Sequence, residues 1–160
     1  MNYKWDLTRI FKDEKEYNES INEVNKLLDE IISYKGKILE SDKTFLELLN
    51  LETKIDKLLS KIYVYSYLGF YDDMGDVKFQ GYKESASSLM VKAGSVTSFI
   101  VPEVLSSEYS VVLEYIDKNK ELELYRYSLE KIFREKSHIL SEKEEKILSD
   151  LGEIMDIPNR

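Results

Sequence analysis

The sequence contains no cysteine and a single histidine, His138. Without cysteine there is no disulfide framework, no thiolate metal site and no Cys–His catalytic pair. The zinc-binding motif His-Glu-x-x-His needs two histidines one helical turn apart, so it cannot occur in these 160 residues. A Gly-x-Ser-x-Gly elbow and a glycine-rich phosphate loop are also missing. These absences exclude the common catalytic templates from this chain.

Proline and glycine are scarce as well, with two and six copies. A fold of many strands needs turn residues every ~8–12 positions, so this low number favours helices. Apolar residues make up 42% of the chain and charged residues 34%, which suits amphipathic helices with solvated outer faces. We predict an all-α fold: a bundle of long antiparallel helices followed by a cluster of shorter helices, in a single domain over residues 1–160.

The net charge is −8, and lysine and arginine form no local stripe. An acidic surface repels phosphate backbones and anionic membranes, so we expect neither nucleic acid nor a membrane as a partner. The first residues, Met1 to Asp6, lack the apolar run of a secretory signal peptide. No stretch approaches the roughly 18 apolar residues of a membrane span. The absence of cysteine permits a cytoplasmic location.

Apolar residues recur at steps of three and four over residues 17–34, which predicts a first helix. Asp13 and Glu16 have the spacing of a capping box at its start, and Gly36 suits the left-handed position that follows a helix end. Trp5 lies close to the N-terminus, where we expect it to anchor the chain end on the core.

A second helix of about 30 residues is predicted between Ser41, its N-cap, and the Asp-rich turn at residues 72–76. Asp76 can cap a third helix, whose buried face runs over residues 79–100 and whose middle is rich in Ala, Ser and Gly. Pro102 interrupts this pattern because it lacks the N–H that a helix needs. The aspartates of the turn also suggest a calcium loop, but their spacing departs from an EF-hand, so a solvated turn with a helix cap is favoured.

The last third of the chain predicts shorter helices, over residues 111–116, over residues 122–133, and beyond a capping box formed by Ser141 and Glu144. His138 precedes this cap. We interpret His138 as a junction residue that bonds a helix end. A metal or catalytic role lacks partners in the sequence, and contact with another protein stays open.

Tyrosine is abundant, with 12 copies, and four of them crowd the end of the second helix. Tyr63 and Tyr67 lie one turn apart on its apolar face, so we expect them in the core or at its rim, with hydroxyls that reach water. Tyr65 and Tyr71 lie off that face. They are our candidate peptide- or domain-contacting residues, because tyrosine offers a large amphipathic surface at low entropic cost.

Six short motifs follow one another over nearly the whole chain, from Trp5 to Leu151. They are Trp5-Asp6-Leu7-Thr8-x-Ile10-Phe11, Tyr34-Lys35-Gly36-Lys37-Ile38, Tyr63-x-Tyr65-x-x-Leu68, Phe99-x-x-Pro102-Glu103-Val104, Tyr125-Arg126-x-x-Leu129 and Arg134-x-Lys136-x-His138-x-Leu140-Ser141-x-x-Glu144-Glu145-x-Ile147-Leu148. In this order and spacing they resemble the N-terminal domain of oligoendopeptidase F, a family of thimet-oligopeptidase-like zinc metallopeptidases.

The resemblance implies that the chain is the non-catalytic N-terminal domain of a larger cytoplasmic zinc metalloendopeptidase that hydrolyses oligopeptides. The zinc and the catalytic residues would then lie in a C-terminal catalytic domain beyond residue 160. No cofactor and no catalytic or metal-binding residue is therefore assigned to this chain. The domain would have that catalytic domain as its partner and would form part of the wall of the peptide-binding channel.

The helical periodicities alone also fit a stand-alone protein-interaction module. An enzyme that works with carboxylates only is disfavoured, because the acidic residues fall mainly on faces expected in solvent. The accessory-domain hypothesis predicts an exposed apolar patch larger than monomers usually show, where the catalytic domain docks.

Overall fold

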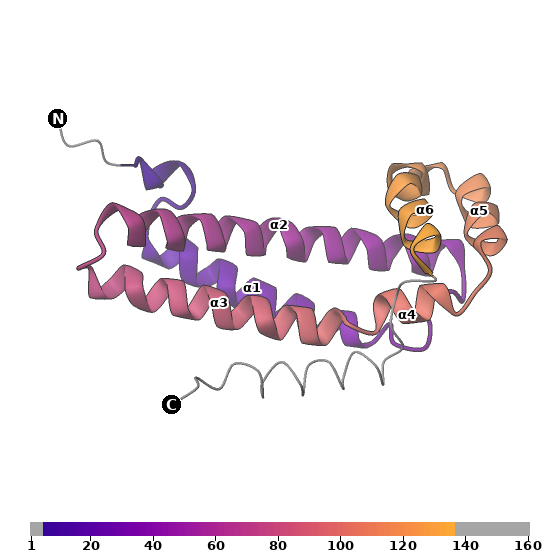
Figure 1. The fold of residues 1–160 in the computed structure, drawn as a ribbon, viewed down its shortest axis with the longest axis horizontal. Helices are drawn as coiled ribbons and strands as arrows, with labels where there is room; N and C mark the ends of the chain where they lie inside the picture. Colours follow the sequence, from indigo (N-terminus) through magenta and orange to yellow (C-terminus); the bar gives the residue numbers. More distant parts are fainter. Residues whose placement is uncertain (1–4, 137–160) are drawn as a thin grey trace, which may run out of the picture. The chain divides into compact units, whose positions relative to one another are not determined.

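The computed structural model describes residues 5–136 (Figure 1). The described residues contain helices, turns and connecting segments and no strand, which confirms the predicted all-α fold. Its elements in chain order are η1 (Leu7–Arg9), α1 (Glu14–Ile32), α2 (Asp42–Asp72), α3 (Val77–Thr97), α4 (Ile100–Leu105), α5 (Tyr109–Lys118), η2 (Lys120–Tyr125) and α6 (Arg126–Arg134). His138, the cap at Ser141 and the helix predicted after it lie outside the described residues.

The start of α1 is fixed by two hydrogen bonds from backbone N–H groups to side-chain carboxylates. The Asp13 carboxylate accepts a hydrogen bond from Glu16 N at 2.9 Å, and the Glu16 carboxylate accepts one from Lys12 N at 2.8 Å. The first bond satisfies an N–H that the first helical turn leaves unpaired, and the second fixes the chain that enters the helix. Gly36 has a φ of 79°, the left-handed conformation predicted for it. Helix α1 ends earlier than predicted, however, at Ile32 with Ser33 as its C-cap, so Gly36 lies in the turn that follows and not next to the helix end.

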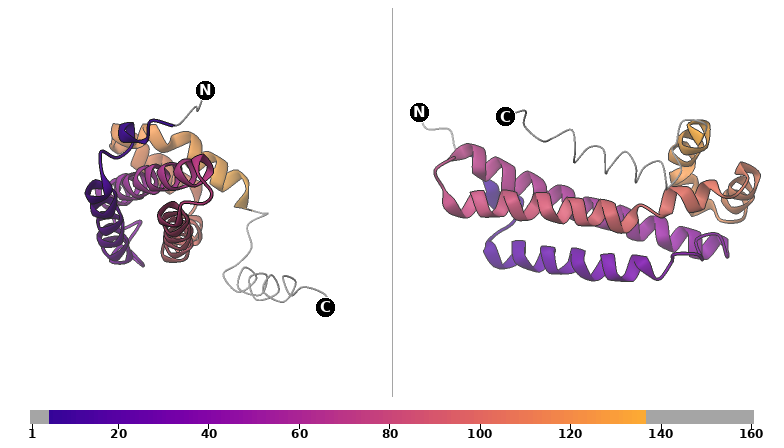
Figure 2. Two further views of the ribbon diagram at one scale, coloured as in Figure 1. Left: turned by 90° about the vertical axis from the view of Figure 1, so that its left-hand side faces the viewer. Right: turned by 60° about the horizontal axis from the view of Figure 1, so that its bottom comes forward.

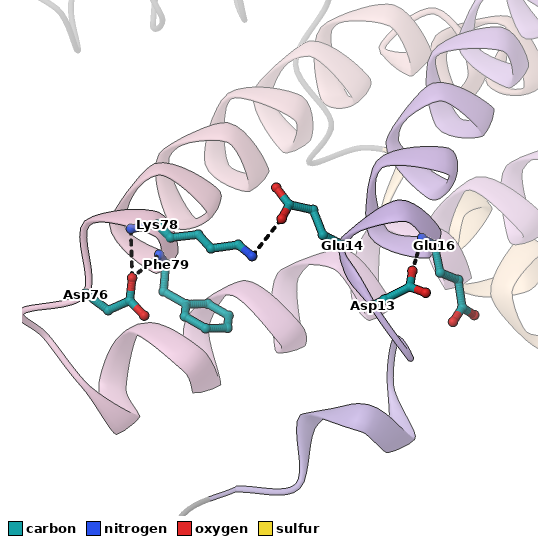
Figure 3. A network of polar contacts seen from close by, with 6 residues as sticks. All are labelled: Asp13, Glu14, Glu16, Asp76, Lys78 and Phe79. Carbon is teal, nitrogen blue, oxygen red and sulfur yellow. Dashed lines mark hydrogen bonds and ion pairs between the residues drawn. The ribbon is translucent and has the colours of Figure 1, made fainter.

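The long helices α2 and α3 begin at the predicted caps. Ser41 Oγ accepts a hydrogen bond from Thr44 N at 3.1 Å. The Asp76 carboxylate accepts two, from Lys78 N at 2.8 Å and Phe79 N at 3.3 Å (Figure 3). Helix α2 runs antiparallel to both α1 and α3, and the three helices form a bundle (Figures 1 and 2).

Contacts divide the chain into two compact units, Met1–Phe99 and Ile100–Arg160. The first unit holds the three-helix bundle, and its core includes Val24, Leu28, Ile31, Phe45, Leu48, Ile55 and Ile62. The second unit holds α4, α5, η2 and α6 around the buried side chains of Val104, Val112, Ile116, Leu122 and Leu129. The assignment of residues 1–160 to one domain stays a prediction.

Two further helix boundaries differ from the prediction. Helix α3 ends at Thr97, and Ile100 already belongs to α4. A continuous helix would drive the Pro102 ring into the carbonyl of Ser98, four residues earlier, so the chain breaks there and Pro102 lies in the first turn of α4. The helix predicted over residues 122–133 is also divided, because Leu122 lies in the 3₁₀ turn η2 and α6 begins only at Arg126.

The prediction that Trp5 anchors the chain end is wrong, since its side chain is 63% exposed. Asp6 accepts hydrogen bonds from Thr8 N at 3.2 Å and Thr8 Oγ1 at 2.5 Å and so caps the N-terminus of η1. The chain then places Phe11, only 1% exposed, on the core. The Phe11 ring packs edge-on against Tyr17 and Tyr65, with centroids 5.6 and 5.2 Å away.

Candidate contact surface on α2 and α3

A cluster of five buried or half-buried aromatic rings fills the bundle where α1, the end of α2 and the start of α3 meet. Its members are Phe11, Tyr17, Tyr65, Phe79 and Tyr82. Tyr65 is 8% exposed, and its ring centroid lies 5.2 Å from that of Tyr17 and 5.6 Å from that of Phe79. The prediction that Tyr65 lies off the apolar face is therefore wrong. Because α2 is covered by α1 on one side and α3 on the other, its buried face is wider than one apolar stripe.

Ser66 is the polar residue that this cluster buries completely, with 0% exposure. Its hydroxyl donates to Ile62 O at 2.8 Å, and Tyr17 Oη lies 3.0 Å from Ser66 Oγ. Burial raises the pKa of Tyr17, and the bond to Ser66 opposes that rise. The pair satisfies two hydroxyls inside the bundle, as buried polar groups require.

An ion pair closes the cluster at the surface. Lys78 Nζ lies 2.7 Å from Glu14 Oε2 and links the first turn of α3 to that of α1 (Figure 3). This bond lowers the pKa of Glu14 and raises that of Lys78. The Tyr82 hydroxyl has no well-aligned hydrogen bond among the described residues, although Glu14 and Lys78 both act on it electrostatically. Burial first, and Glu14 second, raise the pKa of Tyr82 to about 12, so it stays protonated at neutral pH and cannot serve as a base.

Outside the bundle, the rings of Tyr63, Tyr67 and Tyr71 follow one another along α2; we call this row the tyrosine stripe. The rings of Tyr63 and Tyr67 stack at a centroid distance of 4.0 Å, and Tyr67 and Tyr71 are 6.3 Å apart. Tyr63 is 37% exposed and Tyr71 59% exposed. Tyr71 therefore lies on the surface, where the sequence places it. Whether Tyr65 or Tyr71 contacts a peptide or another domain stays a prediction, and burial leaves Tyr65 little surface for it.

The tyrosine stripe is attached to α3 by two contacts. Tyr67 Oη lies 3.0 Å from Ser87 Oγ. Lys83 Nζ lies 4.0 Å from the centroid of the Phe70 ring, 5.5 Å from that of Tyr67 and 5.9 Å from that of Tyr71. These cation–π contacts hold an ammonium group among three ring faces. The stripe is thus a preorganised surface rather than a row of independent side chains.

Helix α3 exposes an outward row of residues at helical spacing, which we call the α3 face: Val77, Gly81, Glu84, Ser88, Val91 and Ser95. Val77 is 80% exposed and Val91 is 74% exposed, and Met90 beside them is 44% exposed. A Cβ atom added at Gly81 or at Gly94 would meet no atom within 4 Å, so the bundle itself does not require glycine there.

The segment Val77–Leu105 is apolar enough, with a mean hydropathy of 1.3 over its best 18 residues, to pass a membrane-span test by length and composition. Only 28% of that window is buried. One such helix is weak evidence for a membrane, and the expectation of no membrane partner stays a prediction. The composition of this helix, with a middle rich in Ala, Ser and Gly, did not tell which of its faces stays uncovered.

The described residues contain no group of three or more His, Asp or Glu side chains that could hold a metal ion. In the Asp-rich turn, the Asp73 carboxylate accepts a hydrogen bond from Gly75 N at 2.9 Å, and Asp76 caps α3. These roles agree with a turn and a helix cap.

An open groove of about 450 Å³ lies between α1 and α2 and is lined by Leu27, Glu30, Tyr34, Glu47, Asn50, Leu51 and Lys54.

Comparisons with known proteins identify the chain. A family model described as Oligopeptidase F matches residues 103–159. Oligopeptidase PepF of Bacillus subtilis (strain 168) is 33% identical over 151 residues, which are 94% of this chain and 22% of that protein. The plasmid-encoded oligoendopeptidase F of Lactococcus lactis subsp. cremoris is 33% identical over 156 residues, 97% of this chain and 26% of that protein. The chain belongs to the oligoendopeptidase F family.

Within this family the chain corresponds to the N-terminal domain, as the resemblance of its motifs indicates. The crystal structure of oligoendopeptidase-F from Enterococcus faecium has a TM-score of 0.77 to it, at 28% identity, over 90% of this chain and 28% of that one. The chain therefore spans about a quarter of the length of the oligoendopeptidase F relatives it matches.

Proposed function

We propose that this chain is the non-catalytic accessory domain of a zinc-dependent oligoendopeptidase that hydrolyses oligopeptides in the cytoplasm. The observation that supports this most is the match of 94% of the chain to 22% of the length of an oligopeptidase. The domain contributes part of the wall of the peptide channel, and its partner is the C-terminal catalytic domain of the same protein. A preorganised row of exposed tyrosines is suited to such a wall, because rings give contact area with little loss of entropy.

The residues of this chain do not fit a zinc site. Zinc is held in peptidases by histidine and carboxylate side chains, and the whole sequence has one histidine and no cysteine. No metal-holding cluster occurs among residues 5–136. The zinc and the group that activates water therefore come from the remainder of the polypeptide, and this chain takes part by shaping and positioning, without a chemical step of its own.

The first experiment is to read the natural coding sequence beyond codon 160. We expect several hundred further codons that include His-Glu-x-x-His. The full-length protein should then hydrolyse short peptides, lose that activity with a zinc chelator and regain it with zinc, whereas the 160-residue chain should have none. A stop codon soon after codon 160 would contradict the proposal and favour a stand-alone interaction module.

A further inference from the structure

The outer faces of α1 and α3 differ in a way that solvent alone does not explain. On α1 the exposed positions at helical spacing are Lys15, Glu19, Asn22, Lys26 and Asp29, of which four are charged. On the α3 face only Glu84 is charged, and Val77 and Val91 stand 80% and 74% exposed. A helix in water normally turns its charged side outward, as α1 does. The α3 face therefore has the composition of a surface that another structure covers.

The opposite side of α3 is already in use. Ala86, Leu89 and Ala93 are 1%, 7% and 4% exposed and pack within the bundle. Helix α3 is therefore held on one side by its own bundle, while the α3 face on its other side carries two exposed valines and a single charge. A helix that crossed a membrane would instead present apolar residues to lipid all round, and the four charged residues between positions 78 and 92 would be costly there. One covered side and one side with exposed valines and few charges suit a protein partner.

Two glycines indicate how closely that partner approaches. Glycine inside a helix costs about 1 kcal/mol relative to alanine. Neither Gly81 nor Gly94 has a neighbour within 4 Å of the position a Cβ would take. On the α3 face Gly81, Ser88 and Ser95 carry small side chains or none, and Gly94 lies beside them, so that the backbone of a partner can come near.

The tyrosine stripe continues this surface across the seam with α2. Tyr67 is bonded to Ser87 of α3. Because α2 and α3 are antiparallel, the step of four residues from Tyr67 back to Tyr63 corresponds to the step from Ser87 forward to Val91 (Figure 1). Tyr63 and Val91 are therefore at about the same height along the two helices, and both are exposed, at 37% and 74%.

We propose that the α3 face, from Val77 to Ser95, is the docking surface for the remaining part of the oligoendopeptidase F polypeptide. This rests on the proposed function. The relatives supply the occupant, because about three quarters of their length lies outside the part that this chain matches. When this part is docked, Glu84 at the centre of the face should contact a basic or hydrogen-bond-donating group on it.

Thiol labelling tests the docking surface directly, because this chain has no cysteine of its own. The variants are Val91→Cys on the α3 face and Lys26→Cys on the outer face of α1. Each is made in the 160-residue chain and in the full-length protein, and the rate of maleimide labelling at that position is followed by peptide mass mapping. The ratio of the two rates for one variant cancels the intrinsic reactivity of its thiol.

We expect Val91→Cys to react at least tenfold more slowly in the full-length protein than in the 160-residue chain, and Lys26→Cys to react equally fast in both. Equal rates for Val91→Cys in an active full-length peptidase would overturn the docking surface while leaving the proposed function intact. Protection that grows with the concentration of the 160-residue chain would overturn it in favour of a second copy. Protection of the full-length protein only by phosphatidylcholine–phosphatidylglycerol vesicles would overturn it in favour of a membrane.

Discussion

Gly69 of α2 lies directly against the ring of Phe79 of α3. A Cβ atom at position 69 would overlap the ring atoms of Phe79, so this crossing of the two helices requires glycine. The contact lets the Phe79 ring reach the aromatic cluster, where its centroid is 5.6 Å from both Tyr65 and Tyr82. Close approach at one glycine thus decides how the start of α3 packs.

Gly69→Ala should destabilise the chain by about 1–2 kcal/mol. The clash of the new Cβ with the Phe79 ring destabilises the folded state more than the higher helix propensity of alanine stabilises it. Gly81→Ala is the matched control: position 81 faces open space, so the same change should stabilise the chain by up to about 1 kcal/mol. Urea denaturation followed by circular dichroism measures both. In a Phe79→Ala background Gly69→Ala should lose its penalty, and a penalty that persists would show that the ring is not its cause.

The buried hydroxyls of Ser66 and Tyr17 should be energetically coupled. Ser66→Ala leaves Tyr17 Oη with only the distant Tyr82 O, 3.4 Å away, so we expect a loss of about 1–2 kcal/mol. Tyr17→Phe should cost a similar amount. In a double-mutant cycle measured by urea denaturation, the double variant should be about 1 kcal/mol more stable than the sum of the single losses predicts. Strict additivity would mean that the 3.0 Å contact contributes nothing.

The contribution of Glu52 and Asp56 to stability should decline as the pH rises through the carboxyl range. Burial, and then the charge of Asp56, raise the pKa of Glu52, and burial raises the pKa of Asp56. A carboxyl whose folded pKa is raised favours folding while it is protonated, and that contribution is lost as the pH climbs from its ordinary value of 4.5 through the folded pKa.

Glu52→Gln should therefore stabilise the chain at pH 7 by about 0.5 kcal/mol, the scale of a like-charged pair one turn apart, and should flatten the pH dependence above pH 4.5. The measurement is the urea midpoint between pH 4 and pH 8. Glu84→Gln on an exposed position is the control and should leave that slope unchanged. Equal slopes for the parent chain and Glu52→Gln would refute the assignment.

In the full-length protein, Tyr71→Ala should weaken binding of oligopeptides if the tyrosine stripe forms part of the channel wall. Loss of one exposed aromatic contact predicts a KM about threefold to tenfold higher with little change in kcat. Steady-state hydrolysis of a series of short peptides measures it. Tyr127→Ala, at a position that is 75% exposed in the second unit, is the control and should leave KM unchanged. An unchanged KM for Tyr71→Ala would remove Tyr71 from the peptide-contacting surface.

The local chemistry of the chain determined the helix ends that the structure shows. Ser41 and Asp76 cap α2 and α3, because each cap needs only its own side chain and the next few residues. Gly36 takes the left-handed conformation because it has no Cβ atom to oppose it. The ordered motifs likewise determined the family. The predicted end of α3 was misplaced because the Pro102 ring would clash with a carbonyl four residues earlier, so the helix ends well before the proline itself.

Tertiary structure decided which side chains are inside. Tyr65 and Tyr71 are both tyrosines near the end of one helix, yet Tyr65 is 8% exposed and Tyr71 is 59% exposed. Their exposed fractions differ because α1 and α3 cover Tyr65 and leave Tyr71 uncovered. The spacing of apolar residues along α2 does not show where those two helices pack. The same holds for Trp5 and Phe11, and for the exposed valines of the α3 face. Sequence determines the turns and caps through short-range bonds, whereas burial depends on contacts between helices far apart in the chain.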